Sequence, residues 1–162
     1  MNKPDVKNIK TAKRYSNALL KSAIESSLTD KIYYDLIFIS DTIKNNINLK
    51  DFLNSPVIKI SDKKEVIEKI LQPHIDKITL DFLYLLIESG RINIISEILN
   101  QFTIKYNNEK NIVKPLIISA VELDDNQKNR ITESLKNKLK KSIFPEYIIN
   151  SDIIGGLIIE IG

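Results

Sequence analysis

The sequence has no cysteine, no tryptophan and only one histidine. Without cysteine, disulfides, thiolate metal sites and cysteine nucleophiles are all excluded. The histidine, His74, follows Pro73 between two predicted helices, and no sequence pattern gives it a nucleophile or a second metal ligand. Asp124 and Asp125 stand where a helix start favours negative charge, so capping explains them better than acid–base catalysis. We therefore expect no catalytic, cofactor-binding or metal-binding residue.

Long apolar runs and a strong charge bias are also missing. No window approaches the ~18 to 20 apolar residues that cross a bilayer. The amino end has basic residues but lacks the apolar segment of a secretory signal, so we expect no direct membrane insertion. The 24 Lys and Arg residues against 21 Asp and Glu give a formal charge of +3. This excess is too small by itself to indicate a nucleic-acid-binding protein.

Residues 1–106 have the apolar periodicity of helices. Apolar side chains recur there at three- and four-residue spacing, which predicts an all-helical domain, a six-helix bundle. Gly90 fits the position just after the fifth helix, where a left-handed residue ends a helix without a Cβ penalty. Residues 107–111 are polar and are predicted to form a linker. The expected helices span about 9–28, 29–43, 48–55, 61–72, 76–89 and 91–106.

The period changes after the linker, so we expect a smaller α+β domain at 109–162. The segment 111–123 is rich in β-branched residues and contains Pro115, which indicates an edge strand or a strand interrupted near its start. The next segment, 124–142, has acids at its front and lysines at its back, as a helix macrodipole favours. Two short strand-like runs follow, and Gly155 and Gly156 make the turn between them, because no phosphate-binding spacing surrounds these glycines. The predicted fold is therefore mainly α.

Two features of the helical part raise the question of a partner. The run Phe82–Ile87 is apolar in every direction around the fifth helix, and a small bundle rarely encloses one helix completely. The first helix carries a strip of small or amphipathic side chains at helical spacing. Either this strip packs on a neighbouring helix of the same bundle, or it forms a groove that accepts an amphipathic partner helix. The strip consists of Thr11, Tyr15, Ala18 and Ser22.

Four segments resemble the delta subunit of F-type ATP synthases, the family of the mitochondrial oligomycin sensitivity-conferring protein. Tyr15, Ala18 and Leu19 occupy characteristic positions of the first segment, and Gly90 and Arg91 those of the second. The order and spacing of all four agree with the family. Family members usually continue with a further turn and a final helix, so we expect a second domain that is truncated at its carboxyl end. The segments are "TAKRYSNALLKSA" (11–23), "ESGRINIISEILNQF" (88–102), "IISAVELDDNQKNRITESLKNKL" (117–139) and "INSDIIGGLIIEIG" (149–162).

The resemblance implies a stator subunit that performs no chemistry. Its helical domain, 1–106, would bind amino-terminal helices of the alpha subunits on the catalytic head. Its second domain, 109–162, would bind the b subunits of the peripheral stalk. The subunit would hold the head still while the rotor turns, which couples proton translocation to ATP synthesis. The resemblance also implies a peripheral location at the cytoplasmic face of the bacterial plasma membrane, with the stromal face of a plastid membrane as the alternative.

The predicted partner site is a groove between the first and fifth helices. Tyr15 is the expected anchor, because aromatic residues with a polar tip dominate such interfaces. For Arg91 two interpretations stay open: it caps carbonyls of the fifth helix or pairs with Glu88, or it contacts the partner. The predicted groove residues are Tyr15, Ala18, Leu19 and Ser22 on one side, Leu83, Leu86 and Ile87 on the other, and Arg91 at the helix junction.

The alternative function is a basic nucleic-acid-binding module or another helical adaptor. A lysine cluster near the carboxyl end of the last predicted helix and a pI near 8.9 motivate it. No aromatic residues are interleaved with these lysines, and lysines at a helix end usually form a solvated face that complements the dipole. We therefore expect no nucleic-acid partner. The cluster consists of Lys136, Lys138, Lys140 and Lys141.

Overall fold

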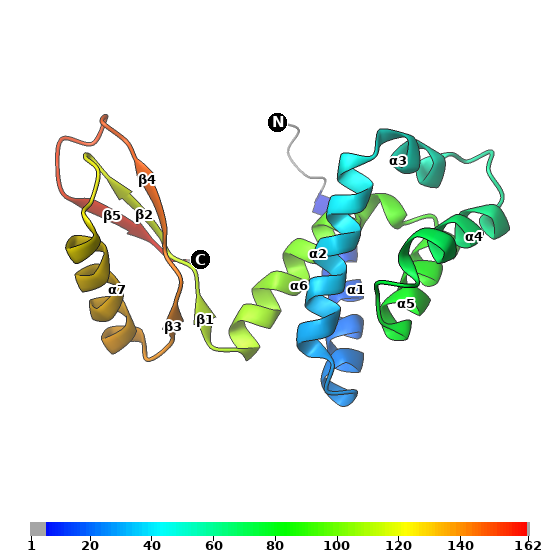
Figure 1. The fold of residues 1–162 in the computed structure, drawn as a ribbon, viewed down its shortest axis with the longest axis horizontal. Coiled ribbons are helices and arrows are strands. Elements are labelled where there is room, and N and C mark those ends of the chain that lie inside the picture. The colour runs from blue at the N-terminus through cyan, green and yellow to red at the C-terminus, as the bar shows by residue number, and fades with distance from the viewer. Residues whose placement is uncertain (1–5, 162) are drawn as a thin grey trace. The chain divides into compact units, whose positions relative to one another are not determined.

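The computed structural model describes residues 6–161 (Figure 1). The chain divides into two compact units, with the boundary between Tyr106 and Asn107. The described part is mostly helical and has a few short strands near its carboxyl end. The prediction of a helical amino-terminal region followed by a smaller α+β part is therefore confirmed at this coarse level.

The first unit is built from α-helices and one short 3₁₀ helix. The predicted linker at 107–111 is wrong in part, because the last of these helices continues to Glu109. The elements are α1 (Val6–Glu25), α2 (Thr29–Asn45), α3 (Ile47–Asn54), α4 (Ile60–Leu71), α5 (Lys77–Glu88), η1 (Ile92–Ile94) and α6 (Ile95–Glu109).

The ends of α5 are fixed by local hydrogen bonds. At its start the side chain of Asp76 accepts from the Ile78 N–H at 2.8 Å, an N-cap that satisfies a free backbone donor. At its end Gly90 has φ +63°, and its N–H donates to the Ile87 carbonyl. The Arg91 N–H donates to the Leu86 carbonyl at 2.8 Å, which completes a Schellman motif. The motif reverses the chain and sets the direction in which Arg91 leaves the helix.

The apolar run of α5 is largely core. Four of its six residues, Phe82, Leu83, Leu86 and Ile87, are buried, whereas Leu85 is 49% exposed. Other helices of the unit also bury apolar residues, including Leu36 on α2 and Phe102 on α6. At ~25 cal/mol per Å2 of apolar area, such burial is the main stabilising contribution in this unit.

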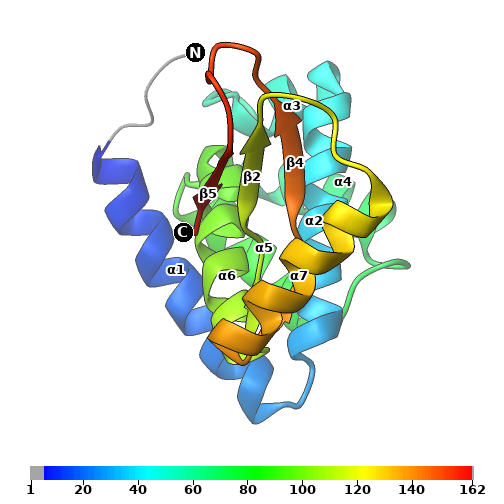
Figure 2. The same cartoon turned by 90° about the vertical axis from the view of Figure 1, so that its left-hand side faces the viewer.

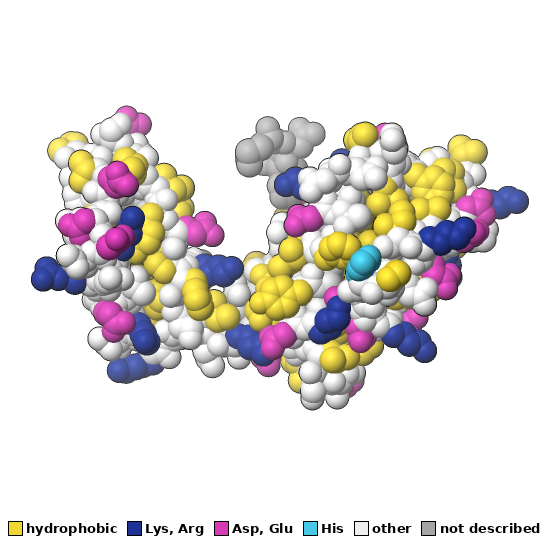
Figure 3. Space-filling model, in the orientation of Figure 1, with side chains coloured by type: hydrophobic (Ala, Val, Ile, Leu, Met, Phe, Trp, Pro, Cys, Tyr) yellow, Lys and Arg dark blue, Asp and Glu magenta, His cyan; other side chains and the backbone are white. Residues whose placement is uncertain are grey.

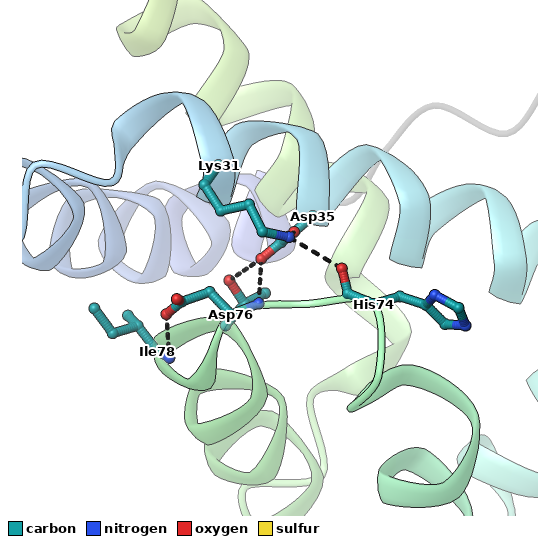
Figure 4. Close-up of polar contacts among 6 residues, drawn as sticks. Lys31, Asp35, His74, Asp76 and Ile78 are labelled. Atoms are coloured by element: carbon teal, nitrogen blue, oxygen red, sulfur yellow. Dashed lines mark hydrogen bonds and ion pairs between the residues drawn. The ribbon is translucent and has the colours of Figure 1, made fainter.

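A buried carboxylate joins α2 to the start of α5 (Figure 4). Asp35 is only 2% exposed, and one of its oxygens accepts from the Asp76 N–H at 2.7 Å and from the Thr79 hydroxyl at 2.9 Å. The Lys31 ammonium pairs with the other oxygen and also donates to the His74 carbonyl at 3.0 Å. No local sequence pattern indicates this network. It holds the first turn of α5 against α2.

A second polar contact ties α6 to α2. The Tyr106 hydroxyl donates to Asp30 at 2.8 Å, and the Tyr106 ring stacks on Tyr33 with centroids 4.1 Å apart. Burial, the hydrogen bond to Asp30 and the negative charge of Asp30 raise the pKa of Tyr106 to about 12. Tyr106 is therefore a neutral donor over the ordinary pH range.

The second unit contains a small mixed sheet and one helix (Figure 2). In the three-stranded sheet β2 is central, parallel to β4 and antiparallel to β5, and β1 pairs with β3 in parallel. Pro115 separates β1 from β2, as the interrupted-strand alternative predicted; among the described strands β1 pairs with β3 alone, whereas β2 is central in its sheet. The elements are β1 (Ile112–Val113), β2 (Leu116–Ser119), α7 (Asp125–Leu139), β3 (Ser142–Ile143), β4 (Glu146–Ile149) and β5 (Leu157–Glu160).

Helix α7 begins with a capping box and packs on the sheet through a small core. The Asp124 side chain accepts from the Gln127 N–H at 2.7 Å, and the Gln127 side chain accepts from the Asp124 N–H at 3.0 Å. The carboxylate of Asp124 thus caps a helix, as predicted. Leu135 of α7 meets Ile117 of β2 in the core, together with Leu123 and Ile143.

Candidate functional site

An open groove lies between α1 and α5. Its main hollow has a volume of about 500 Å3, and a second hollow of about 310 Å3 shares three lining residues with it. We call the two together the α1–α5 groove. Its lining residues are Thr11, Arg14, Tyr15, Ala18, Leu19, Ser22, Glu25, Ser26, Ile78, Asp81, Phe82, Leu85 and Arg91.

The two helices run in opposite directions along this groove. Glu25 at the end of α1 lines the same hollow as Ile78 near the start of α5, whereas Arg14 lines the other hollow with Arg91. From Thr11 to Glu25 the wall is roughly 21 Å long at ~1.5 Å per residue. A partner helix of about four turns matches this length.

The groove is shallow because α1 presents small side chains to it. Ala18 and Ser22 are exposed, while Leu19 is buried below them. On the α5 side Phe82 is buried and Leu85 is half exposed. A wall of small residues allows the backbone of a second helix to approach closely.

Tyr15 is held at the middle of the groove by contacts from the end of α5. The Arg91 Nη1 donates to the Tyr15 hydroxyl at 2.7 Å, and this hydroxyl donates to the Ser89 Oγ at 3.3 Å. The Ser89 hydroxyl in turn donates to the Leu86 carbonyl. The Tyr15 ring meets Phe82 edge to face, with centroids 6.1 Å apart. The phenol is therefore fixed before any partner binds.

The same contacts decide the protonation behaviour of Tyr15. Burial raises the pKa of its hydroxyl, but the hydrogen bonds to Ser89 and Arg91, with the positive charge of Arg91, outweigh burial and leave the pKa below its usual value. Of the interpretations left open for Arg91, pairing with Glu88 is wrong, because Glu88 pairs with Lys64. The Arg91 backbone caps α5, while its guanidinium holds Tyr15.

The structure corrects the α5 side of the predicted groove. Leu83, Leu86 and Ile87 face the core and are 0%, 0% and 4% exposed, so they do not line the groove. The wall is formed instead by the other face of α5. An all-apolar run does not indicate which face of the helix points outward. The charged residue Asp81 indicates this face, and Leu85, four residues later, lies on the same face. The α5 residues of the wall are Ile78, Asp81, Phe82 and Leu85.

A hollow of about 500 Å3 also lies in the second unit, beside the turn that precedes β5. Gly155 and Gly156 line it together with Val121 and Ile131. Only Gly156 has a positive φ, +83°, and a Cβ at either glycine would meet no atom within 4 Å. The turn therefore requires glycine for its conformation at Gly156, and neither glycine is required for space.

A further apolar surface surrounds His74 on the first unit (Figure 3). The imidazole meets the ring of Phe38 with centroids 5.5 Å apart, and Phe38 is 40% exposed. Within residues 6–161 no group of three or more His, Asp or Glu residues is placed to hold a metal ion. Among the described helices, none combines the length and the apolar composition needed to cross a bilayer.

Comparison with known proteins gives a family match over nearly the whole chain. The model of the ATP synthase delta (OSCP) subunit family matches residues 11–162. ATP synthase subunit delta of Trichodesmium erythraeum is 34% identical over 149 residues, covering 91% of this chain and 82% of the relative. Subunit delta of Christiangramia forsetii is 31% identical over 157 residues, covering 97% and 85%.

A solved structure shares the fold. A chain of the Toxoplasma gondii mitochondrial ATP synthase hexamer superposes with a TM-score of 0.68 at 23% identity. The match covers 91% of this chain and 83% of that chain. The likeness therefore extends over both units of the sequence described above.

Proposed function

Because the chain belongs to the ATP synthase delta (OSCP) family, we propose that its α1–α5 groove binds an amino-terminal helix of an alpha subunit. Membership makes the chain a non-catalytic stator subunit of the F-type ATP synthase, a peripheral component of a membrane-bound complex. In this proposal α1 to α6 act as one six-helix bundle that presents the groove to the catalytic head.

The observation that carries the proposal is an open apolar groove that already contains a fixed aromatic anchor. Leu85 is 49% exposed on one wall, and Ala18 is exposed on the other. Amphipathic helices bind in grooves of this kind by laying their apolar face between two helices. Burying several hundred Å2 of apolar area at ~25 cal/mol per Å2 gives a gross gain comparable to the cost of association, and a preformed groove lowers that cost.

For the second unit we propose the complementary contact, to the b subunits of the peripheral stalk. Support comes from the apolar side chains that its sheet leaves exposed, such as Ile148, Ile149 and Ile158, and from the hollow beside Gly156. The two contacts would hold the head against the torque of the rotor. Through this complex the chain would lie at the cytoplasmic face of the bacterial plasma membrane.

Calorimetric titration with a peptide of the first ~25 residues of the alpha subunit tests the groove. We expect saturable one-to-one binding that Ala18→Asp weakens at least tenfold, because a carboxylate would be buried under the partner. Asn17→Asp is the matched control, since Asn17 is exposed on α1 outside the groove. If the wild-type chain is folded by circular dichroism and does not bind, the proposed function of the groove is wrong.

A further inference from the structure

The charged residues of the α1–α5 groove are separated by sign. Arg14 and Arg91 line one hollow, and Glu25 and Asp81 line the other. All four side chains are exposed. Arg14 and Glu25 are eleven residues apart on α1, roughly 16 Å along the helix axis. The groove therefore has a basic end and an acidic end, with the apolar wall of Ala18 and Leu85 between them.

This separation does not stabilise α1 itself. A helix is stabilised by acids in its first turn and bases in its last turn, and α1 has neither. Instead Lys7, Lys10 and Arg14 lie in its amino-terminal half, and Glu25 lies in its last turn. Glu25 in the last turn opposes the macrodipole of α1, and the basic residues of its amino-terminal half do not complement it.

The ion pair of Glu25 with Lys21 does not account for its placement either. The Lys21 and Glu25 charged groups are 3.9 Å apart, and both side chains are more than 60% exposed. Exposed pairs of this kind contribute little, and a lysine on the amino-terminal side of a glutamate is the weaker arrangement on a helix. The pattern therefore points to a group outside the helix.

We propose that the two ends of the groove fix the direction of the bound helix, so that it lies parallel to α1 and antiparallel to α5. This inference rests on the proposed function and specifies its partner. An ordinary amphipathic helix carries acids near its amino end and bases near its carboxyl end. In the parallel orientation its acids lie beside Arg14 and Arg91, and its bases lie beside Glu25 and Asp81.

The reversed orientation would bring like charges together at both ends of the groove. The dipole of α1 opposes the proposed orientation and the dipole of α5 favours it, so the two contributions largely cancel and the side-chain charges decide the direction. Like-charge contacts weaken binding in the wrong orientation more than opposite-charge contacts strengthen binding in the right one. The inverted charges of α1 thus act as a direction signal.

Two synthetic 18-residue amphipathic peptides with identical apolar faces test the direction. One carries Glu in its first two turns and Lys in its last two, and the other carries the same residues in the reverse order. Titrated calorimetrically into the full chain at low salt, the first peptide binds about tenfold more tightly. A nitroxide at its amino end broadens the amide resonances of Thr11 to Tyr15, and a nitroxide at its carboxyl end broadens those of Ser22 to Ser26.

The decisive variant is Arg14→Glu combined with Glu25→Lys. It keeps the net charge and removes the acid that opposes the macrodipole in the last turn of α1, and circular dichroism checks that the variant is folded. In this variant the preference between the two peptides is largely lost, because each end of the groove then carries one charge of each sign, from Arg91 at one end and Asp81 at the other. The ratio of the two peptide affinities is measured once for the wild type and once for the double variant. Each peptide has the same intrinsic helicity in both measurements, so helicity does not contribute to the difference between the two ratios.

The outcomes separate this inference from the proposed function. Equal affinity of the two peptides, or broadening in the opposite pattern, overturns the direction, while binding of the alpha-subunit peptide leaves the groove assignment intact. Failure of all three peptides to bind the folded chain overturns both. A preference that persists at full size in the double variant shows that peptide helicity causes it and also overturns the inference.

Discussion

The guanidinium of Arg91 donates a hydrogen bond to the hydroxyl of Tyr15, 76 positions away in the chain, with Nη1 and Oη 2.7 Å apart. The guanidinium also lies 5.7 Å from the centre of the Tyr15 ring, within the range of a cation–π contact. This pair connects the end of α5 to the middle of α1. It fixes one wall of the groove relative to the other.

Tyr15→Ala is expected to weaken binding of the alpha-subunit peptide at least tenfold, because it removes the aromatic surface at the centre of the groove. Tyr15→Phe keeps the ring and its edge contact with Phe82, so its loss of affinity is smaller. Titration calorimetry measures both, and thermal unfolding checks that each variant is folded. Wild-type affinity in Tyr15→Ala would remove Tyr15 from the interface.

Arg91→Ala is expected to raise the pKa of Tyr15. The lowered pKa depends on Arg91 as hydrogen-bond donor and as positive charge, and its removal leaves burial, which acts in the opposite direction. The measurement is a titration of the Tyr15 ring carbon by NMR in both proteins. Lys64→Ala is the matched control, because Lys64 pairs with Glu88 and does not contact Tyr15. An unchanged pKa in Arg91→Ala would contradict the hydrogen bond.

Tyr106 is expected to make stability depend on pH above pH 10. Its pKa is about 12 in the folded chain and about 10 when unfolded, so the folded state binds more protons between these values. The contribution of neutral Tyr106 is complete below pH 10 and is lost as pH rises toward 12. Urea unfolding from pH 9 to 11.5 should show a steeper fall for the wild type than for Tyr106→Phe. Parallel curves would contradict the raised pKa.

Asp35→Ala is expected to destabilise the fold by about 3 kcal/mol, because it leaves the Asp76 N–H and the Thr79 hydroxyl without their buried acceptor. Asp35→Asn keeps one acceptor oxygen but removes the charge that pairs with Lys31, so its effect is smaller. Urea denaturation measures the free energy of unfolding. The matched control is Asp41→Ala, an exposed position on α2, with an expected change within about 0.5 kcal/mol. Equal effects at the two positions would show that the buried network is not stabilising.

The order of the helices and the α1 side of the groove were predictable, because small and apolar residues at helical spacing are a local signal. The α5 side was not, since a run such as Phe82–Ile87 is apolar on all faces and the outward face is chosen by the surrounding helices. Asp35 looked like any charged residue of a solvated helix face. Its burial depends on Asp76 and Thr79, which are more than 40 positions away.

The strands show the same limit. Pro115 predicted an interruption of the strand, because proline has no backbone N–H to donate to a neighbouring strand. The central position of β2 depends on β4 and β5, whose pairing is set by contacts distant in sequence. The sequence therefore predicted three strand-like segments, missed β3 at Ser142–Ile143, where a helix was expected to continue to 142, and left the order of the strands undetermined.

The left-handed turn at Gly90 has a consequence for genetics. Gly90 lines no part of the groove, yet its backbone conformation, φ +63°, aims Arg91 at Tyr15. Any L-residue there is strained, even though a Cβ would meet no atom within 4 Å. A selection for cells that hydrolyse ATP without pumping protons should therefore recover substitutions at Gly90 beside those in the groove itself. Such substitutions would turn Arg91 away from Tyr15, and second-site suppressors would map to α1.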